Sequence, residues 1–239
     1  MHTEDIEYTV DGARFVGHLA VDTDRVGIRP GVLVCHEGPG LGDHAKDVAD
    51  RLADLGYVAF ALDYHGDGKP LPRDQVMNRL GPLMADADRI RQLGAAGLDV
   101  LRQHALTDTS RIAAIGYCFG GTMALELGRG GAELQVIVGF HSGLATARPL
   151  DAANITASVL VCIGSEDPIV PPEQRLAFEQ EMRAGGVDWR MNLYGNAAHS
   201  FTNPLADTFA RPGIAYHEPS DRRSWRAMLD LFDERFATV

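Results

Sequence analysis

Residues 111–128, RIAAIGYCFGGTMALELG, decide the fold class of this chain. A short apolar run leads directly into Gly116-Tyr117-Cys118-Phe119-Gly120-Gly121, and apolar residues at helical spacing follow at once. A strand, a tight glycine-flanked turn and a helix in this order have the form of a nucleophile elbow, with cysteine in the usual place of serine. The stretch therefore predicts a buried strand and a covering helix, with Cys118 at the turn between them.

The chemistry of such a turn favours a reactive cysteine. The positive end of the helix that begins after Cys118 favours thiolate over thiol. The same helix start offers the backbone N–H of Phe119 to an oxyanion. On these residues alone, a glycine-rich turn holding an inert cysteine remains an alternative.

Apolar runs continue the pattern on both sides of the elbow. Short strands are expected at GVLVCHE, YVAFALD, LQVIVGF, SVLVCIG and DWRMNLYG, with helical patterns between them. Continuous apolar strands separated by helices predict an α/β fold with a mostly parallel central sheet and helices on both faces. The N-terminal run IEYTVDGARFVGHLAVD alternates around Asp11-Gly12, which predicts an antiparallel hairpin.

Three further elements are expected from turn and cap signals. Residues 64–82 are rich in glycine and proline and are expected to form mainly a loop. A long helix is expected over about residues 83–104. The terminal helix is expected to begin with Ser220 as its N-cap.

Composition sets limits on the class of protein. The 239 residues suit a single α/β domain spanning residues 1–239, and 45% hydrophobic with 23% charged residues is typical of a soluble globular protein. A net charge of −11 disfavours a nucleic-acid partner. No apolar stretch approaches the ~18 residues that span a bilayer. The polar N-terminus does not resemble a signal peptide, so a cytoplasmic location without membrane attachment is expected.

The cysteine count argues against a disulfide framework. Of the three cysteines, Cys35 and Cys162 lie inside apolar runs and are expected to be small buried core residues. Cys118 differs because its neighbours include glycines.

Two downstream residues complete a catalytic order. In parallel sheets, ligands bind beyond the carboxyl ends of the strands. Asp167 follows the strand SVLVCIG, and His199 lies in a loop after the last strand. Cys118, Asp167 and His199 appear in the nucleophile–acid–histidine order of α/β-hydrolases. His199 would act as base and then protonate the leaving group, while Asp167 would orient the imidazole. Glu166 is the rival for the acid role.

Glu37 follows the strand GVLVC, in the segment that supplies a second oxyanion donor in such folds, here the N–H of Gly38. A carboxylate near a thiolate is electrostatically costly. One hypothesis is that Glu37 gates the thiol: it holds the proton of Cys118 in the empty site, and substrate displaces it. The alternative is a solvated loop acid.

Other polar residues at strand ends are candidate pocket-lining residues. This set comprises Tyr64, His65, His141 and Asn203. His36, His65 and His141 lack the spacing of metal ligands and have no acid pair beside them, so neither a metal nor any other cofactor is expected.

These residues and motifs resemble those of a known family. The chain resembles the dienelactone hydrolase (carboxymethylenebutenolidase) family of α/β-hydrolases, from about residue 30 to the C-terminus. The resemblance implies Cys118 as nucleophile, His199 as base, Asp167 as acid, Glu37 near the thiol and the N–H of Phe119 in the oxyanion hole. The matching pieces are LVCHEGPGL, YVAFALDYHGDG, SRIAAIGYCFGG, IGSEDPIVPPEQ, GVDWRMNLYGNAAHSFTNP and RRSWRAMLDLFDE.

The departures from the family concern the substrate. Members that open dienelactone hold its carboxylate with two arginines, and this chain has Asp67 and Asn203 at those places. Loss of bidentate guanidinium contacts removes the family's carboxylate anchor. Arg73 or Arg211 would have to compensate from nearby loops. The resemblance therefore implies the hydrolase class and leaves the substrate open.

The sequence as a whole predicts a thiol-dependent hydrolase of small-molecule carboxylic esters or lactones that works through a thioester. One alternative is a Cys-elbow protein of the glutaminase or redox-sensing kind. Such glutaminases carry His and Glu close together late in the chain, whereas His217 and Glu218 are adjacent and expected in a loop. The other is a non-catalytic binding protein on the same fold.

Overall fold

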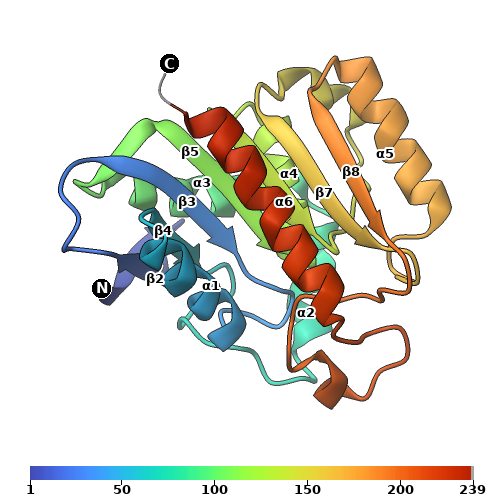
Figure 1. The fold of residues 1–239 in the computed structure, drawn as a ribbon. Helices are drawn as coiled ribbons and strands as arrows, with labels where there is room; N and C mark the ends of the chain where they lie inside the picture. Colours follow the sequence, from blue (N-terminus) through green and yellow to red (C-terminus); the bar gives the residue numbers. More distant parts are fainter. Residues whose placement is uncertain (238–239) are drawn as a thin grey trace. The chain divides into compact units, whose positions relative to one another are not determined.

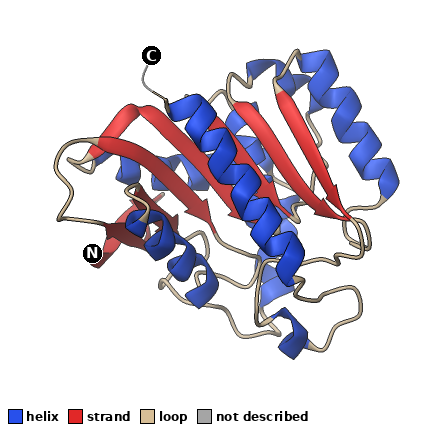
Figure 2. Ribbon diagram, viewed as in Figure 1, coloured by secondary structure: helices blue, strands red, loops and turns tan. Residues whose placement is uncertain are grey.

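A computed structural model describes residues 1–237 of the chain. The chain divides into two compact units, Met1–Ile115 and Gly116–Val239. The boundary falls within strand β5 (Thr107–Tyr117), two residues before its end. Each unit is built from strands with helices packed on them (Figures 1 and 2).

The first unit carries strands β1 (His2–Val10), β2 (Ala13–Val21), β3 (Arg29–Cys35) and β4 (Val58–Leu62), and most of β5. Its strands lie in the order β1-β2-β4-β3-β5. Strands β1, β2 and β4 pair antiparallel, whereas β3 and β4 pair parallel. Helices α1 (Asp43–Asp54), α2 (Val76–Met84) and α3 (Ala87–Gln103) belong to the same unit.

The N-terminal hairpin is present as predicted. Val10 pairs with Ala13, so Asp11 and Gly12 form a two-residue turn. Both residues have positive φ, at 51° and 76°, as the type I′ turn requires. The Asp-Gly dipeptide thus sets the register of the whole ribbon.

The second unit contains the parallel strands β6 (Val136–Phe140), β7 (Ser158–Gly164) and β8 (Trp189–Tyr194) in this spatial order. Helices α4 (Phe119–Arg129) and α6 (Glu218–Phe236) both pack on β6, and α6 also packs on β7. Helix α5 (Pro172–Gly185) packs on the short helix η1 (Pro149–Asn154). A second short helix, η2 (Ala206–Phe209), precedes α6.

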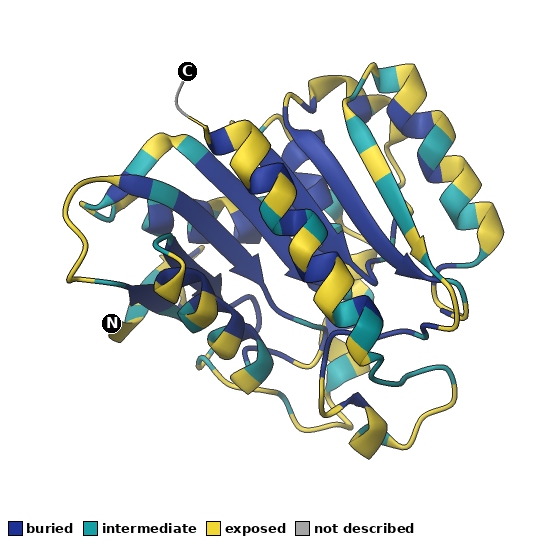
Figure 3. Cartoon of the chain, viewed as in Figure 1, coloured by how far each residue is buried: buried dark blue, intermediate teal, exposed yellow. Residues whose placement is uncertain are grey.

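Burial explains why these apolar runs are strands. Every residue of β6 and β7 is buried, while β8, at the end of the strand order, is mostly part-exposed (Figure 3). Buried parallel strands read as continuous apolar runs because helices cover them. Among residues 1–237, no helix combines the length and the apolar character needed to cross a bilayer.

The long helix expected over residues 83–104 is present as α3, which begins four residues later than expected and follows a separate short helix. Helix α2 ends at Met84, and α3 begins at Ala87. Between them, the Asp86 carboxylate accepts the N–H of Arg89 at 2.9 Å, an N-cap contact that starts a new helix. The expectation of a loop over residues 64–82 is wrong for residues 76–82, which belong to α2. This short helix accommodates Pro82 in its interior.

The terminal helix begins three residues earlier than expected. His217 is its N-cap, and Pro219 lies in the first turn, which suits proline because its missing N–H would have no partner there. Ser220 is therefore inside the helix and not its cap, and its hydroxyl bonds to the His217 imidazole at 2.7 Å.

Candidate active site

The elbow has the strained geometry that the sequence predicted. Cys118 has φ 55° and ψ −120°, a conformation that costs a non-glycine residue of order 1–3 kcal/mol. Two backbone bonds hold it there. The N–H of Cys118 donates to the carbonyl of Phe140 at 3.0 Å, and the N–H of Gly121 donates to the carbonyl of Cys118 at 3.1 Å. The end of β6 thus supports the turn that carries the sulfur.

The glycines beside Cys118 are required by close packing. A Cβ on Gly116 would lie 2.1 Å from the carbonyl oxygen of Gly120. A Cβ on Gly121 would lie 1.6 Å from the Ser142 hydroxyl. The strand and the helix therefore approach so closely that neither position accepts a side chain. Phe119 then starts α4, where the first N–H groups have no acceptor within the helix.

The other end of α4 is fixed by a buried ionic cluster. The Arg129 guanidinium binds both carboxylate oxygens of Glu181 on α5, at 2.7 and 3.0 Å. It also donates to Glu126 and to the carbonyl of Leu144, each at 3.0 Å. These charge-assisted hydrogen bonds offset the cost of burying the guanidinium. Helix α4 is thus held at both ends.

His199 and Asp167 meet within the second unit, as the sequence order predicted. His199 Nδ1 lies 2.8 Å from Asp167 Oδ2, and both side chains are buried. The second carboxylate oxygen of Asp167 accepts the N–H of Ile169 at 2.8 Å. Glu166, the rival acid, is exposed and accepts the Ser165 hydroxyl instead. The acid that contacts the imidazole is therefore Asp167.

The loop that carries His199 is held by backbone contacts on two sides. The N–H of Glu166 donates to Ala197 at 2.9 Å, and Gly164 approaches Ala197 so closely that a Cβ would lie 2.2 Å from its carbonyl oxygen. His199 itself donates to the carbonyl of Gly213 and accepts from Ala215. These two backbone hydrogen bonds, with Gly213 and Ala215, fix the backbone from which the imidazole projects.

The electrostatics of His199 favour its cation. Burial lowers the pKa of the imidazole, but the hydrogen bond to Asp167 and the interaction with Cys118 outweigh it and raise the pKa to about 10. Within residues 1–237, His199 Nε2 has no well-aligned hydrogen-bond partner. The Cys118 sulfur is nevertheless near enough to stabilise the charge. The ring therefore carries both protons at neutral pH.

A second histidine packs against the first. The His141 and His199 rings meet edge to face with centroids 5.1 Å apart. His141 is fully buried at the end of β6, has φ 41° and bonds to the Thr202 hydroxyl at 2.8 Å. The residue expected to line a pocket thus contacts the His199 loop. Asn203, from the same expected set, is buried in a turn and accepts the N–H of Leu205 at 2.9 Å.

The remaining cysteines are core residues, as expected. Cys35 and Cys162 are fully buried, whereas Cys118 is part-exposed. Burial raises the pKa of the Cys162 thiol to about 12 and also raises that of Cys35. Neither core thiol is therefore a candidate nucleophile. In the described part of the chain, no group of three or more metal-ligating side chains is assembled.

Glu37 and Gly38 follow β3 in the first unit. One carboxylate oxygen of Glu37 lies 3.5 Å from Nδ1 of His44 on α1, and both side chains are largely buried. The association of these two residues with Cys118 remains a prediction.

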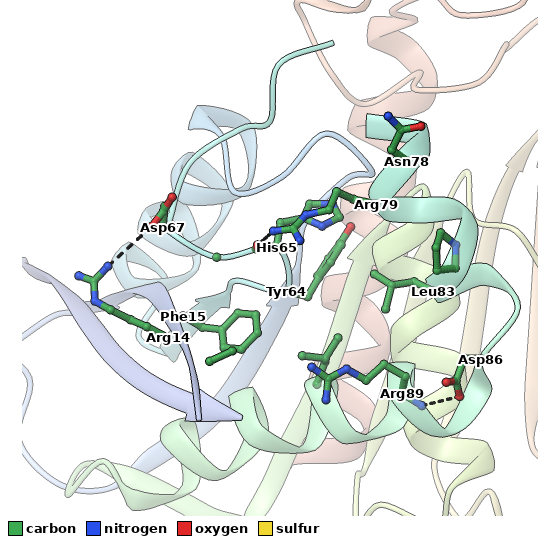
Figure 4. Close-up of a pocket in the computed structure, with 14 residues that line it drawn as sticks. Arg14, Phe15, Tyr64, His65, Asp67, Asn78, Arg79, Leu83, Asp86 and Arg89 are labelled. Atoms are coloured by element: carbon green, nitrogen blue, oxygen red, sulfur yellow. Dashed lines mark hydrogen bonds and ion pairs between the residues drawn. The ribbon is translucent and has the colours of Figure 1, made fainter. Parts of the chain in front are cut away.

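A cavity of about 580 Å³ lies within the first unit (Figure 4). Tyr64 and His65, expected to line a pocket, are in its wall together with Asp67. The wall also holds three arginines that sequence reasoning did not select: Arg14, Arg79 and Arg89. They come from the hairpin, α2 and α3, and no local pattern signals that these elements line one cavity. Arg14 lies 3.9 Å from Asp67, and Arg79 donates to the carbonyl of His65 at 2.7 Å. Arg73 and Arg211 are not part of this wall.

Comparison with known proteins identifies the family of the chain. The model of the dienelactone hydrolase family matches residues 16–236. This chain belongs to the dienelactone hydrolase family. The match crosses the boundary between the two units, and the expectation of a single domain stays a prediction.

Two curated relatives are similar over nearly their whole length. Protein usf of Aquifex pyrophilus is 29% identical over 239 residues, covering 96% of this chain and 97% of the relative. A putative carboxymethylenebutenolidase of Yersinia pestis is 27% identical over 246 residues, covering 98% and 89%.

Solved structures show the α/β-hydrolase fold of this family. A protein named m3DLH is 48% identical, covers 99% of each chain and has a TM-score of 0.95. A dienelactone hydrolase-like promiscuous phosphotriesterase from metagenomic libraries is 43% identical, covers 98% of each chain and has a TM-score of 0.94. The predicted fold class and family are thereby confirmed, and the chain is assigned to a family of hydrolases.

Proposed function

We propose that this protein is a thiol-dependent hydrolase of small carboxylic esters or lactones. Cys118 is the nucleophile, His199 the general acid and base, and Asp167 the group that orients His199. The single observation that carries the proposal is the buried 2.8 Å bond from Asp167 to His199, in the unit that also holds Cys118 at a strained elbow.

The reaction proceeds in two acyl-transfer steps. The Cys118 sulfur attacks the carbonyl carbon, and the N–H groups of Phe119 and Gly38 bind the resulting oxyanion. As the intermediate collapses, His199 gives its proton to the leaving alkoxide, and a thioester remains on Cys118. Water then loses a proton to His199 and attacks the thioester, which releases the carboxylic acid and restores the thiolate–imidazolium pair. No cofactor takes part in either step.

The protonation state of His199 supports this assignment. An imidazole whose pKa is about 10 holds a proton ready for the leaving group at neutral pH. Asp167 keeps the ring oriented with Nε2 directed away from itself, toward the reacting atoms.

Glu37 acts as the gate of the thiol in this proposal. While no substrate is bound, its carboxylate accepts a hydrogen bond from the Cys118 thiol and so keeps the proton on sulfur. When substrate displaces the carboxylate, it takes that proton with it and leaves the thiolate beside His199. The largely buried contact with His44 at 3.5 Å supports the assignment, because it gives the carboxylate a second partner besides the thiol. We place the enzyme in the cytoplasm, since free cysteines and no disulfide fit a reducing compartment.

A neutral phosphotriester is a second candidate substrate. The observation that favours it is the 43% identity over 98% of each chain to a promiscuous phosphotriesterase. Attack of the Cys118 sulfur on phosphorus would expel an aryloxide, with His199 supplying the proton. The phosphorylated thiol would then be hydrolysed by water, as the thioester is.

One panel of assays tests the proposal. Wild type, Cys118→Ala and His199→Ala are compared on aryl esters, small lactones, dienelactone and an aryl phosphotriester. We expect hydrolysis of at least one ester or lactone by wild type and loss of about 10³-fold or more in both variants. Equal rates for wild type and Cys118→Ala would refute the mechanism. No hydrolysis by wild type would favour a glutaminase-like, redox-sensing or binding protein.

A further inference from the structure

The segment that follows β3 is held by its backbone carbonyls. The Tyr64 hydroxyl lies 3.0 Å from the carbonyl oxygen of His36 and 2.9 Å from that of Glu37. His36 Nδ1 lies 2.6 Å from the same oxygen of Glu37. His65 Nε2 lies 2.8 Å from the carbonyl oxygen of Gly38. Three successive carbonyls are thus bound by side chains.

These donors are themselves fixed. The His36 and Tyr64 rings stack with centroids 3.7 Å apart, and His65 packs edge-on against Tyr64 at 4.6 Å. Burial lowers the pKa of His36 to about 3, so its ring stays neutral and carries one N–H. Among residues 1–237, His36 Nε2 has no hydrogen-bond partner, which fits a tautomer whose proton is on Nδ1 and points at Glu37.

Asp63 holds the backbone that carries Tyr64 and His65. Its buried carboxylate accepts the N–H groups of His65, Gly66 and Gly68 at 2.9 to 3.0 Å, and that of Val16 at 3.2 Å. A carboxylate with four backbone donors fixes the start of this loop. The backbone from which the Tyr64 ring projects is therefore rigid. Figure 4 shows this ring in the wall of the cavity.

Because the peptide bond is planar, holding the carbonyl of one residue also fixes the direction of the next residue's N–H. A trans peptide is planar, so the carbonyl of one residue and the N–H of the next point in opposite directions. Holding the carbonyl of Glu37 therefore fixes the N–H of Gly38. The carbonyl of Glu37 is bound by the Tyr64 hydroxyl, by the His36 ring and by the backbone N–H of Gly40, the last at 3.1 Å. If the hydroxyl of Tyr64 were absent, the peptide would lose one of these three donors and rotate more readily.

We propose that Tyr64 is a positioning residue: its hydroxyl and the His36 imidazole hold the Glu37–Gly38 peptide so that the N–H of Gly38 presents itself to the oxyanion. His65 supports the same arrangement through the carbonyl of Gly38. The role rests on the proposed function, in which Gly38 is an oxyanion donor. Tyr64 acts on the reaction only through this peptide.

The substitution Tyr64→Phe tests the proposal because it removes one oxygen and keeps the stacked ring. Outright removal of an oxyanion donor costs about 10²–10³ in kcat. Losing only the group that positions the donor should therefore lower kcat by about 10- to 100-fold, with KM within about twofold. Tyr194→Phe is the matched control, since it removes a part-buried hydroxyl that contacts Cys162 and Asn192 instead. We expect wild-type kcat for the control.

Two further measurements separate positioning from a general structural effect. An aldehyde analogue forms a tetrahedral adduct with the thiol and uses the oxyanion donors, whereas the matching amide binds as a ground-state ligand. Tyr64→Phe should weaken the aldehyde by the same factor as kcat and leave the amide unchanged. Equal weakening of both ligands, or no change in kcat, would overturn the proposal.

The amide resonance of Gly38 in the NMR spectrum of the free protein provides a readout that needs no turnover. We expect Tyr64→Phe to shift it and to speed its hydrogen exchange, while Tyr194→Phe does neither. If wild type hydrolyses no ester but this resonance still responds to Tyr64→Phe, the proposed function is contradicted. The hold of Tyr64 on the Glu37–Gly38 peptide would then still be supported. An unaffected resonance would contradict that hold itself.

Discussion

Asp167 Oδ2 lies 2.8 Å from His199 Nδ1, and neither side chain is more than 4% exposed. This bond decides which imidazole nitrogen remains available for chemistry. A ring turned by 180° would lose the bond and place a carbon against the carboxylate. The other oxygen of Asp167 is occupied by the N–H of Ile169, so the carboxylate itself cannot rotate freely.

Replacing the acid by its amide should disable the pair. Asp167→Asn keeps the shape but removes the charge that stabilises the imidazolium and offers the ring a donor in place of an acceptor. We expect kcat on an aryl ester to fall by about 10²–10⁴-fold. Glu166→Gln, at the exposed neighbouring acid, should stay within twofold. A comparable loss in both variants would argue against the specific role of Asp167.

The raised pKa of His199 should appear in the stability of the protein. The ordinary histidine pKa is about 6.5, and the folded value is about 10. The folded state therefore holds the proton more tightly. The stabilisation is fully present below about pH 6.5 and is lost as pH rises through about 10.

Urea unfolding measured from pH 6 to pH 10.5 checks this expectation. Wild type should lose stability relative to His199→Gln between about pH 6.5 and about pH 10 and show no further change above that. A difference between the two proteins that does not change with pH would contradict the assignment.

Thiol alkylation should be selective. The thiols of Cys35 and Cys162 are buried and have raised pKa values, whereas Cys118 is part-exposed. We expect iodoacetamide to add one group to the native protein by intact mass, and none to Cys118→Ala. Two or more adducts on the folded protein would show that burial does not protect the core thiols.

The gating role of Glu37 predicts a change in the same reaction. If the carboxylate holds the proton of Cys118, Glu37→Gln should alkylate faster near neutral pH and have an altered rate profile against pH. Glu173→Gln, at an exposed acid in the first turn of α5, is the control and should match wild type. A profile for Glu37→Gln that overlays the wild-type curve would remove the gate from the mechanism.

The buried ionic cluster predicts a large effect on stability. Glu181→Gln removes one charge that neutralises Arg129, and breaking a buried pair on one side costs about 3–5 kcal/mol. Glu179→Gln, which breaks an exposed pair with Arg183 on the same helix, should cost less than about 1 kcal/mol. Urea unfolding measures both. Equal losses would mean that burial does not set the strength of the cluster.

The sequence predicted those parts of the fold and site that depend on local pattern. Apolar runs identified the strands, Asp11-Gly12 identified the hairpin, and residues 116–121 identified the elbow. The contact of Asp167 with His199 was expected because the carboxyl ends of parallel strands converge, so a residue's position after a strand indicates which residues lie near it. Their catalytic roles stay a prediction.

The parts that sequence missed depend on contacts between a side chain and distant backbone. Nothing in the local pattern around Tyr64 signals that its hydroxyl binds the carbonyls of residues 36 and 37. The contact of His141 with Thr202 joins residues 61 positions apart, and the local sequence does not indicate it either. The division of α2 from α3 depends on a single cap at Asp86, which helical periodicity alone does not reveal.

The strained turn at Cys118 also bears on how such enzymes change over evolutionary time. The strain lies in φ and ψ, so serine in this position would bear the same cost as cysteine. The two side chains differ in one atom, and a single base change converts the codon of one into a codon of the other. The elbow thus lets a lineage exchange sulfur for oxygen chemistry in one mutational step, without rebuilding the scaffold that presents the nucleophile.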